Sequence, residues 1–335
     1  MKVLITGGTG YIGSHTSVEL INKGIDVVIV DNLSNSDFEV VNRIERITGV
    51  RPAFYKTDIC SRSELFRVFE NEKIDSVIHF AALKSISESV EKPLLYYENN
   101  VTGTMNVCEA MKRFNVKKIV LSSSAAVYGL TGNNPLKEEA PLFPYNPYGR
   151  TKMIQEHIVS DFAESESFGA VILRYFNPIG AHESGLIGEN PKGKPSNLMP
   201  YISQVAAGRL EKLFVFGSDY KTPDGTGVRD YIHVSDLARG HLQALIKLEN
   251  NTGVFTYNIG SGRGHSVLDM IKSFEKASGR KIAFELAERR PGDVDMCYAD
   301  SSLAEKELDW KAECSIDKMC ADEWRWQKLN PNGYE

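Results

Sequence analysis

The first 31 residues constrain the fold most strongly. Val3–Ile5 form a short apolar run, and glycines follow at positions 7, 10 and 13 in a Gly-x-x-Gly-x-x-Gly spacing. Residues 14–23 carry apolar side chains at helical spacing, and a second apolar run ends in Asp31. These are the parts of a βαβ unit: a buried parallel strand, a glycine-rich turn, a helix and a second strand.

Each part of this unit has a physical role in binding a dinucleotide. Gly7 permits the tight turn, Gly10 lets the backbone approach a pyrophosphate, and Gly13 lets the helix pack against the strand. The helix N-terminus offers free N–H groups to phosphates. A carboxylate at Asp31 can accept hydrogen bonds from the adenosine ribose and would repel a 2′-phosphate, which favours NAD over NADP. The alternative for Asp31 is a helix or turn cap.

Composition narrows the class of protein. Of the 335 residues, 42% are hydrophobic and 25% charged, and the formal net charge is -5. These values favour a globular protein with a large core, and they argue against a nucleic-acid partner or a membrane-surface role. No apolar run reaches about 18 residues, so we expect neither a transmembrane helix nor a signal peptide.

The cysteines and histidines suggest a reduced, metal-free protein. The five cysteines are odd in number, and none forms Cys-x-x-Cys. We therefore expect free thiols and a cytoplasmic location. The seven histidines are too scattered to supply a zinc site.

Strands and helices are predicted to alternate after Asp31. Further strands are expected at 53–56, 76–80, 118–121 and 171–174. Helices are expected after a capping box, Ser61-Arg62-Ser63-Glu64, over 94–114, and from near Tyr148. Such alternation predicts an α/β fold with a doubly wound, Rossmann-like parallel sheet, whose ligand lies beyond the carboxyl ends of the strands.

The pattern changes after about Asn177, where glycine, proline and asparagine become frequent. We expect an NAD-binding domain over residues 1–176 and a smaller mixed α/β domain over 177–335 that mainly binds the substrate, with some elements returning to the first. Helices are expected at 198–208, 234–247, 267–278 and 316–328, and strands at 255–259 and 282–284.

A Tyr-x-x-x-Lys pair, Tyr148 and Lys152, is the candidate catalytic centre. Residues four apart share a helix face, so the ammonium would lie near the phenol and lower its pKa from about 10. A tyrosine so tuned can take a proton from a sugar hydroxyl, and Ser124, at a strand end, could hydrogen-bond the same hydroxyl. Such a pair also occurs by chance on many helices; the glycine motif and the strand-terminal serine favour catalysis.

These motifs resemble the extended short-chain dehydrogenase/reductase superfamily, and within it the UDP-glucose (UDP-galactose) 4-epimerases. The similar blocks lie at 7–15, 31–36, 77–84, 174–178, 197–201 and 224–233. The resemblance implies that Tyr148 removes the proton of the sugar 4-hydroxyl while carbon 4 gives its hydride to a permanently held NAD⁺. The 4-keto sugar then turns over and is reduced on its opposite face. A homodimer is also implied, with helices near 100–114 and 153–162 at its interface.

The resemblance implies two sets of ligand-binding residues. For NAD they are Gly7, Gly10, Tyr11, Ile12, Gly13, Asp31, Asn32, Asn35, Ser36, Asp58, Ile59, Phe80, Ala81, Lys84, Asn99, Tyr148, Lys152, Tyr175 and Phe176. For the UDP-hexose they are Lys84, Ser124, Tyr148, Asn177, Asn197, Leu198, Phe214, Phe216, Arg229, Arg290, Asp293 and Cys297. Arginines suit a diphosphate, and phenylalanines can pack on uracil. The alternatives are core packing for the phenylalanines, surface ion pairs for the arginines and a helix cap for Asp58.

Cys297 bears on the substrate range. The resemblance aligns it with a position beside the sugar where bacterial members restricted to unacetylated sugars often have a tyrosine. A cysteine is smaller and would leave room for a 2-acetamido group. We therefore expect interconversion of UDP-N-acetylglucosamine and UDP-N-acetylgalactosamine as well. The alternative is a small core residue without effect on range.

Three other functions compete with epimerisation. An NAD-dependent sugar-nucleotide 4,6-dehydratase typically has Asp-Glu directly after the strand-terminal serine or threonine, because it must expel water. Here Ser124 is followed by Ala125-Ala126, which cannot move protons. A UDP-uronic acid decarboxylase is a weaker alternative. A non-catalytic NAD-binding protein is disfavoured by the presence of Ser124, Tyr148 and Lys152.

Overall fold

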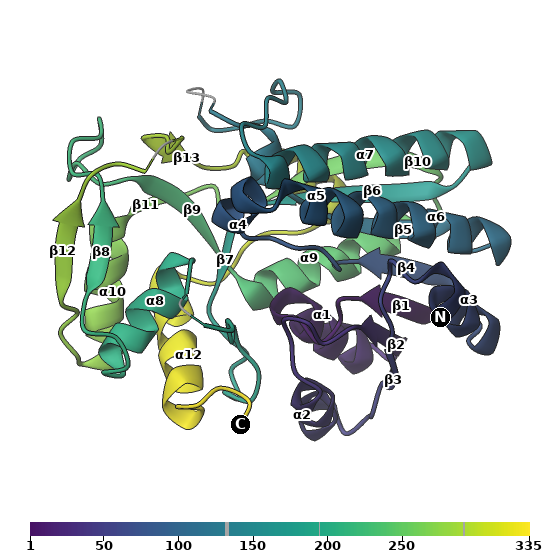
Figure 1. Cartoon of the computed structure of the whole chain (residues 1–335), viewed down its shortest axis with the longest axis horizontal. Coiled ribbons are helices and arrows are strands. Elements are labelled where there is room, and N and C mark those ends of the chain that lie inside the picture. Colours follow the sequence, from purple (N-terminus) through teal and green to yellow (C-terminus); the bar gives the residue numbers. More distant parts are fainter. Residues whose placement is uncertain (131–133, 194, 291) are drawn as a thin grey trace.

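A seven-stranded parallel sheet forms the centre of the molecule (Figure 1). The computed structural model describes residues 1–130, 134–193, 195–290 and 292–335. The strands lie in the order β10-β6-β5-β4-β1-β2-β3, and all neighbours run parallel. Their bounds are β1 (Lys2–Thr6), β2 (Asp26–Asp31), β3 (Ala53–Lys56), β4 (Ser76–His79), β5 (Lys118–Ser124), β6 (Gly169–Tyr175) and β10 (Gly253–Ile259). The predicted Rossmann-like α/β fold is confirmed.

Helices cover both faces of this sheet, which is why its strands are apolar on both sides. Figure 1 shows α1 and α9 on one side and α6 and α7 on the other. The side chains of Val3 and Ile5 pack into the first layer, and that of Leu4 packs into the second. The helices are α1 (Tyr11–Asn22), α2 (Glu39–Thr48), α3 (Arg62–Asn71), α4 (Ile86–Glu91), α5 (Pro93–Tyr96), α6 (Gly103–Arg113), α7 (Pro147–Glu166) and α9 (Val234–Lys247).

The long helix predicted over 94–114 is interrupted. A π-helical turn, Tyr97–Thr102, separates α5 from α6. It buries Asn100, whose Nδ2 donates to the Leu83 carbonyl at 3.0 Å and to Thr151 Oγ1 at 2.9 Å. Asn100 thus supplies an amide that links the loop after β4 to α7. Such turns are frequent at functional sites.

The predicted capping box at Ser61 is wrong. Helix α3 begins at Arg62, but the Ser61 side chain caps no N–H group. The chain enters the helix through a turn in which Asp58 accepts from the Cys60 and Ser61 N–H groups, and the resulting ψ of 86° at Ser61 is not the extended one typical of a capping residue. A capping box does open α10 (Val267–Ser278), where Ser266 and Asp269 cap each other's backbone.

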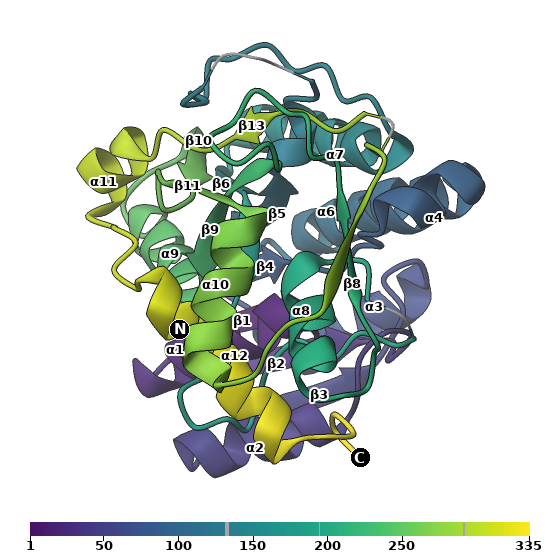
Figure 2. The ribbon, with the colours of Figure 1, turned by 90° about the vertical axis from the view of Figure 1, so that its left-hand side faces the viewer.

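Smaller sheets and three helices form the C-terminal part of the molecule. One sheet holds β7 (Asn177–Ile179), β9 (Val228–His233), β11 (Gly264–Ser266) and β13 (Met296–Cys297), and a second pairs β8 (Leu213–Phe216) with β12 (Phe284–Ala287). Figure 2 shows α8 (Leu198–Ala206), α10 (Val267–Ser278) and α12 (Ile316–Leu329) side by side. They share a separate apolar core that includes Ile202, Phe274 and Met319.

Two elements beyond residue 177 belong to the main sheet. Strand β10 adds to its edge beside β6, and α9 packs against its face. The predicted strand at 255–259 is therefore present, whereas the one expected at 282–284 lies slightly later, as β12. The remaining helices are η2 (Ala125–Val127) and α11 (Ser302–Leu308). Among the described helices, none is both long and apolar enough to cross a bilayer.

Candidate active site

The glycine-rich turn between β1 and α1 has the geometry of a phosphate cradle. Gly7 has a φ of +70°, and a Cβ there would lie 2.8 Å from the Ala81 nitrogen. A Cβ at Gly10 would lie 3.1 Å from the Gly7 carbonyl oxygen, and one at Gly13 would overlap that oxygen. Side chains are therefore excluded at Gly7 and Gly13, and the space at Gly10 is tight.

The N-terminus of α1 is left open for a ligand. Among the residues that the structure describes, no side chain caps this helix, and its first turn contains no acidic residue. Its free N–H groups and positive potential can thus bind phosphate oxygens. The turn and the helix together fit the pyrophosphate of a dinucleotide.

The Asp31 carboxylate organises the loop at the carboxyl end of β2. It accepts hydrogen bonds from the backbone N–H groups of Thr9 (3.2 Å) and Leu33 (2.9 Å) and from Ser36 Oγ (2.8 Å). Asp31 therefore acts as a turn cap, and its position beside the glycine turn also suits a ribose. The two roles are compatible because a carboxylate has about four acceptor sites.

Other residues predicted to bind NAD lie near Asp31 in the sequence or the structure. Asn32 Nδ2 donates to Asp58 Oδ2 at 2.9 Å, and Asp58 also caps the Cys60 N–H group. Asn35 is exposed in the loop after Asp31, whereas Ile59 is buried. This part of the predicted NAD set is thus gathered in one place.

Tyr148 and Ser124 meet at the carboxyl end of the main sheet. Tyr148 lies in the first turn of α7, which the Asn146 side chain caps by accepting from the Gly149 N–H group at 2.8 Å. Ser124 is the last residue of β5. Burial raises the pKa of Tyr148 above its usual value, while a hydrogen bond with Ser124 and the Lys84 cation oppose this shift.

Lys152, whose effect on the pKa of Tyr148 stays a prediction, contacts the backbone of β5. Its Nζ donates to the Ser122 backbone carbonyl at 2.7 Å, underneath the end of β5. Burial lowers the pKa of Lys152 to about 7, and nearby Glu156 partly opposes this. Tyr148 and Lys152 share a face of α7, and the Lys152 ammonium is hydrogen-bonded to the buried Ser122 carbonyl. The Lys84 cation also favours the phenolate of Tyr148.

Aromatic residues form the base of the predicted site. Tyr175 Oη is 2.8 Å from His241 Nε2, and the Phe80 ring centroid is 4.7 Å from that of His241. Phe176 is buried with Val127. The Phe80 and Ala81 N–H groups both donate to the Thr6 carbonyl, so the chain after β4 is held against β1.

Residues predicted to bind the UDP-hexose lie on the smaller sheets and in the segment between β12 and β13. Arg229 NH2 is 2.7 Å from Asp293 Oδ1, and Cys297 pairs with Arg229 in the register of β13 and β9. The Arg290 guanidinium lies over the Phe216 ring, 4.3 Å from its centroid. These residues therefore form one group of charged and aromatic side chains.

The packing alternative for the two phenylalanines is wrong. In β8, Leu213 and Val215 point into the C-terminal core, while Phe214 is half-buried and Phe216 is 36% exposed. The alternation of the strand turns both rings away from the core. The ion-pair reading of Arg229 is correct, but its partner Asp293 is itself a predicted site residue.

The remaining predicted residues are placed by hydrogen bonds from their side chains. Asn177 Nδ2 donates to the Asp230 carbonyl at 2.9 Å, and Asn99 Nδ2 donates to Asn100 Oδ1 at 2.9 Å. Asn197 precedes α8, and Leu198 begins it. Tyr11 Oη donates to the Gly180 carbonyl at 2.5 Å, which links the first turn of α1 to the segment after β7.

Glu189 is a site residue that the sequence did not reveal. Its Oε1 accepts from both Lys84 Nζ and Asn197 Nδ2, two predicted ligand-binding groups. Glu189 lies in the irregular segment between β7 and α8, where no periodicity or motif marks it. Only the folded chain brings it to Lys84.

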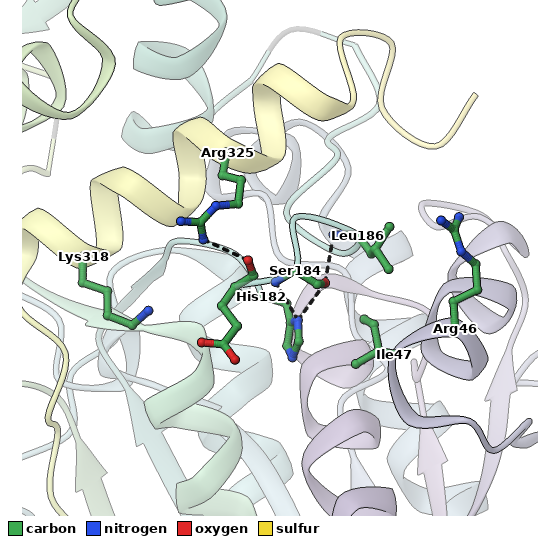
Figure 3. Close-up of a pocket in the computed structure, with 8 residues that line it drawn as sticks. Arg46, Ile47, His182, Ser184, Leu186, Lys318 and Arg325 are labelled. Carbon is green, nitrogen blue, oxygen red and sulfur yellow. Dashed lines mark hydrogen bonds between the residues drawn. The ribbon is translucent and has the colours of Figure 1, made fainter.

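A separate pocket of about 600 Å³ lies between α2 and α12 (Figure 3). Its lining residues are Arg46, Ile47, His182, Glu183, Ser184, Leu186, Lys318 and Arg325. None of them belongs to the predicted site. The two α12 cations, Lys318 and Arg325, are already paired with Asp322 at 2.8 and 2.7 Å. We therefore assign no ligand to this pocket.

Comparison with known proteins agrees with the geometry. The family model described as GDP-mannose 4,6 dehydratase matches residues 4–323. The UDP-glucose 4-epimerase of Bacillus subtilis is 54% identical over 336 residues, covering 100% of this chain and 99% of that protein. The Drosophila melanogaster UDP-glucose 4-epimerase is 56% identical over 342 residues, covering 99% and 98%. A crystal structure of the Bifidobacterium longum UDP-glucose 4-epimerase in complex with NAD⁺ and UDP has a TM-score of 0.96, with 52% identity and coverage of 99% and 100%.

Proposed function

The chain belongs to the UDP-glucose 4-epimerase family of extended short-chain dehydrogenases/reductases, and we propose that it inverts carbon 4 of UDP-glucose and UDP-galactose with bound NAD. The observation that carries this proposal is the interaction of Tyr148 with Ser124, by a hydrogen bond, and with Lys84, by charge. It lies at the carboxyl end of the sheet, where the glycine cradle also lies. The relative from Bifidobacterium longum binds NAD⁺ and UDP, which supports both ligands.

In this proposal each half of the chain holds one ligand. Residues 1–176 mainly bind NAD, through the glycine turn, the open end of α1 and Asp31. When bound, NAD supplies the redox chemistry at carbon 4. Residues 177–335 mainly bind the UDP-hexose, with Arg229 and Arg290 on the diphosphate.

The catalytic work of the chain is proton transfer. The Tyr148 phenol takes the proton of the 4-hydroxyl and later returns it, and Ser124 hydrogen-bonds the same oxygen. The Lys84 cation favours the phenolate that this requires. Lys152 supports the site by donating a hydrogen bond to the Ser122 carbonyl, which fixes the end of β5.

A 4,6-dehydratase is the main alternative, and the description of the matching family model names that reaction. The residues after Ser124 argue against it. Ala125–Val127 form a 3₁₀ turn with apolar side chains, which offers no acid to expel water. A UDP-uronic acid decarboxylase and a non-catalytic NAD-binding protein are the weaker alternatives.

One incubation separates these functions. Purified protein is mixed with UDP-galactose without added NAD, and the products are resolved by chromatography. UDP-glucose without net NADH supports the proposal. A dehydrated keto sugar supports a dehydratase, and the absence of any product supports a binding protein; either result contradicts epimerisation.

We further propose that the substrate range includes UDP-N-acetylglucosamine and UDP-N-acetylgalactosamine. Cys297 lies beside Arg229 in the paired strands and packs against the apolar cluster around Phe176. Its small side chain is consistent with space for a 2-acetamido group at this position.

We also propose that the protein is a cytoplasmic homodimer. Leu94, Leu95 and Met105, on α5 and α6, are 82%, 44% and 54% exposed. Exposed apolar side chains on neighbouring helices favour an interface with a second copy, here through the 100–114 and 153–162 helices. Light scattering after size exclusion tests this: the mass of a dimer supports it, and that of a monomer contradicts it. All five cysteines are free thiols, which suits the cytoplasm.

A further inference from the structure

Glu189 joins two ligand donors that come from different parts of the chain. Its Oε1 accepts from Lys84 Nζ at 2.7 Å and from Asn197 Nδ2 at 3.0 Å. Lys84 follows β4 of the main sheet, whereas Asn197 immediately precedes α8 among the C-terminal elements. The Glu189 side chain is only 7% exposed, while that of Lys84 is 53% exposed. A buried carboxylate therefore holds a cation whose other side is open.

The C-terminal residues fix the backbone of Glu189. Trp326 Nε1 donates to the Glu189 carbonyl at 3.3 Å. Tyr334 Oη donates to the Gly188 carbonyl at 3.0 Å and accepts from the Gly188 N–H group at 3.2 Å. The backbone that carries this carboxylate is thus held independently of Lys84 and Asn197, so Glu189 can position these two groups.

A second buried carboxyl, that of Glu323, lies within electrostatic range of Glu189. Burial, and then the charge of Glu189, raise the pKa of Glu323 to about 8, although a hydrogen bond with Ser203 opposes this. Glu323 is therefore neutral at pH 7. Burial lowers the pKa of Lys84, but pairing with Glu189 outweighs it and keeps the ammonium charged. The same ammonium acts electrostatically on the Tyr148 phenol.

We infer that Glu189 is a positioning residue of the proposed epimerase site. By holding the Lys84 ammonium and the Asn197 amide on one oxygen, it sets the spacing between a donor of the NAD-binding half and a donor of the substrate-binding half. Glu189 acts through these two groups. The inference rests on the proposed function for the identity of the ligands.

The first test needs no turnover. NAD-saturated wild type, Glu189→Gln, Glu189→Asp and the control Glu183→Gln, an exposed residue of the same segment, are acetylated briefly at pH 8, and modification of Lys84 is measured by peptide mass spectrometry. We expect about threefold or more faster labelling of Lys84 in Glu189→Gln, because loss of the carboxylate lowers its pKa. Glu189→Asp should restore part of the protection, and Glu183→Gln should match wild type. Unchanged labelling in Glu189→Gln would overturn the inference even if the protein had no epimerase activity.

The second test uses turnover of UDP-galactose and a double-mutant cycle. We expect Glu189→Gln to raise KM about tenfold with a smaller change in kcat, since a charge-assisted hydrogen bond to a substrate-binding amide is lost. Added to Asn197→Ala, the same substitution should raise KM by less than about twofold, because residues that act as a unit are not additive. Fully additive effects, with a lowered melting temperature in every Glu189 variant, would show a merely structural role and overturn the inference.

Discussion

The Glu323 carboxyl of α12 is enclosed in the protein within electrostatic range of the Glu189 carboxylate. Two acidic groups in one buried place cannot both ionise without a large penalty. Glu189 accepts hydrogen bonds from two donors, Lys84 and Asn197. Glu323 is instead kept protonated, with a pKa raised to about 8. The pKa of this carboxyl on the C-terminal helix thus reflects burial first and then the charge of Glu189.

This pair predicts a pH dependence of stability. An unfolded Glu323 titrates near 4.5 and the folded one near 8. Between these values the folded chain binds one proton more, so this group lowers stability as pH rises from 4.5 to 8, by up to about 1.4 kcal/mol per pH unit. Glu323→Gln removes the effect. The melting temperature of Glu323→Gln minus that of wild type should therefore increase by several degrees between pH 5.5 and pH 8.5, because 1 kcal/mol corresponds to roughly 2–4 °C.

The matched control for this pH series is Glu305→Gln, on the exposed side of α11. Its melting temperature should follow that of wild type at every pH. A Glu323→Gln curve parallel to wild type would show that the carboxyl titrates normally and would contradict the assignment.

Asp31→Ala should weaken NAD binding. A charged acceptor for two ribose hydroxyls contributes about 1.5–3 kcal/mol, which corresponds to roughly a 10- to 100-fold change in affinity. The measurement is the NAD retained per chain after gel filtration, determined by extraction and chromatography. Asp26→Ala, at the exposed start of the same strand, should retain NAD as wild type does. Unchanged retention in Asp31→Ala would remove the ribose assignment.

Cys297→Tyr should narrow the substrate range. The larger ring would fill the space proposed for the 2-acetamido group, so turnover of UDP-N-acetylgalactosamine should fall by about tenfold or more while that of UDP-galactose is retained. Cys297→Ser, of similar size, should behave as wild type. Equal turnover of the acetylated sugar by the tyrosine variant and wild type would refute the role of Cys297.

Much of the fold follows from local patterns in the chain. Apolar runs bounded by glycine, such as Val3–Ile5, identify the buried strands, and helices such as α9 and α10 begin and end where their periodicity does. The π-helical turn could not be predicted, because it is fixed by tertiary hydrogen bonds of Asn100 to Leu83 and Thr151. Spacing alone reads that segment as a regular helix.

The sequence predicts which residues belong to the candidate site, but it does not predict which of them interact with one another. Tyr148 and Ser124 do meet, and the Lys152 ammonium binds the Ser122 carbonyl, a contact that the sequence did not indicate. Helical spacing gives the shared face of Tyr148 and Lys152, but it says nothing of which buried acceptor competes for the ammonium. Glu189 has no local signal, because its role arises from contacts far away in sequence.

The central claim is that the Tyr148 phenol moves the proton while the cofactor stays bound. The most direct measurement compares Tyr148→Phe with wild type for turnover of UDP-galactose and for NAD content in the same preparation. Tyr55→Phe, which removes a phenol bonded to Glu72 outside the site, is the control and should act as wild type. We predict that Tyr148→Phe loses about 10²–10⁴ in turnover, the usual contribution of a general acid–base, and retains its NAD. Turnover near the wild-type rate in NAD-loaded Tyr148→Phe would contradict the account.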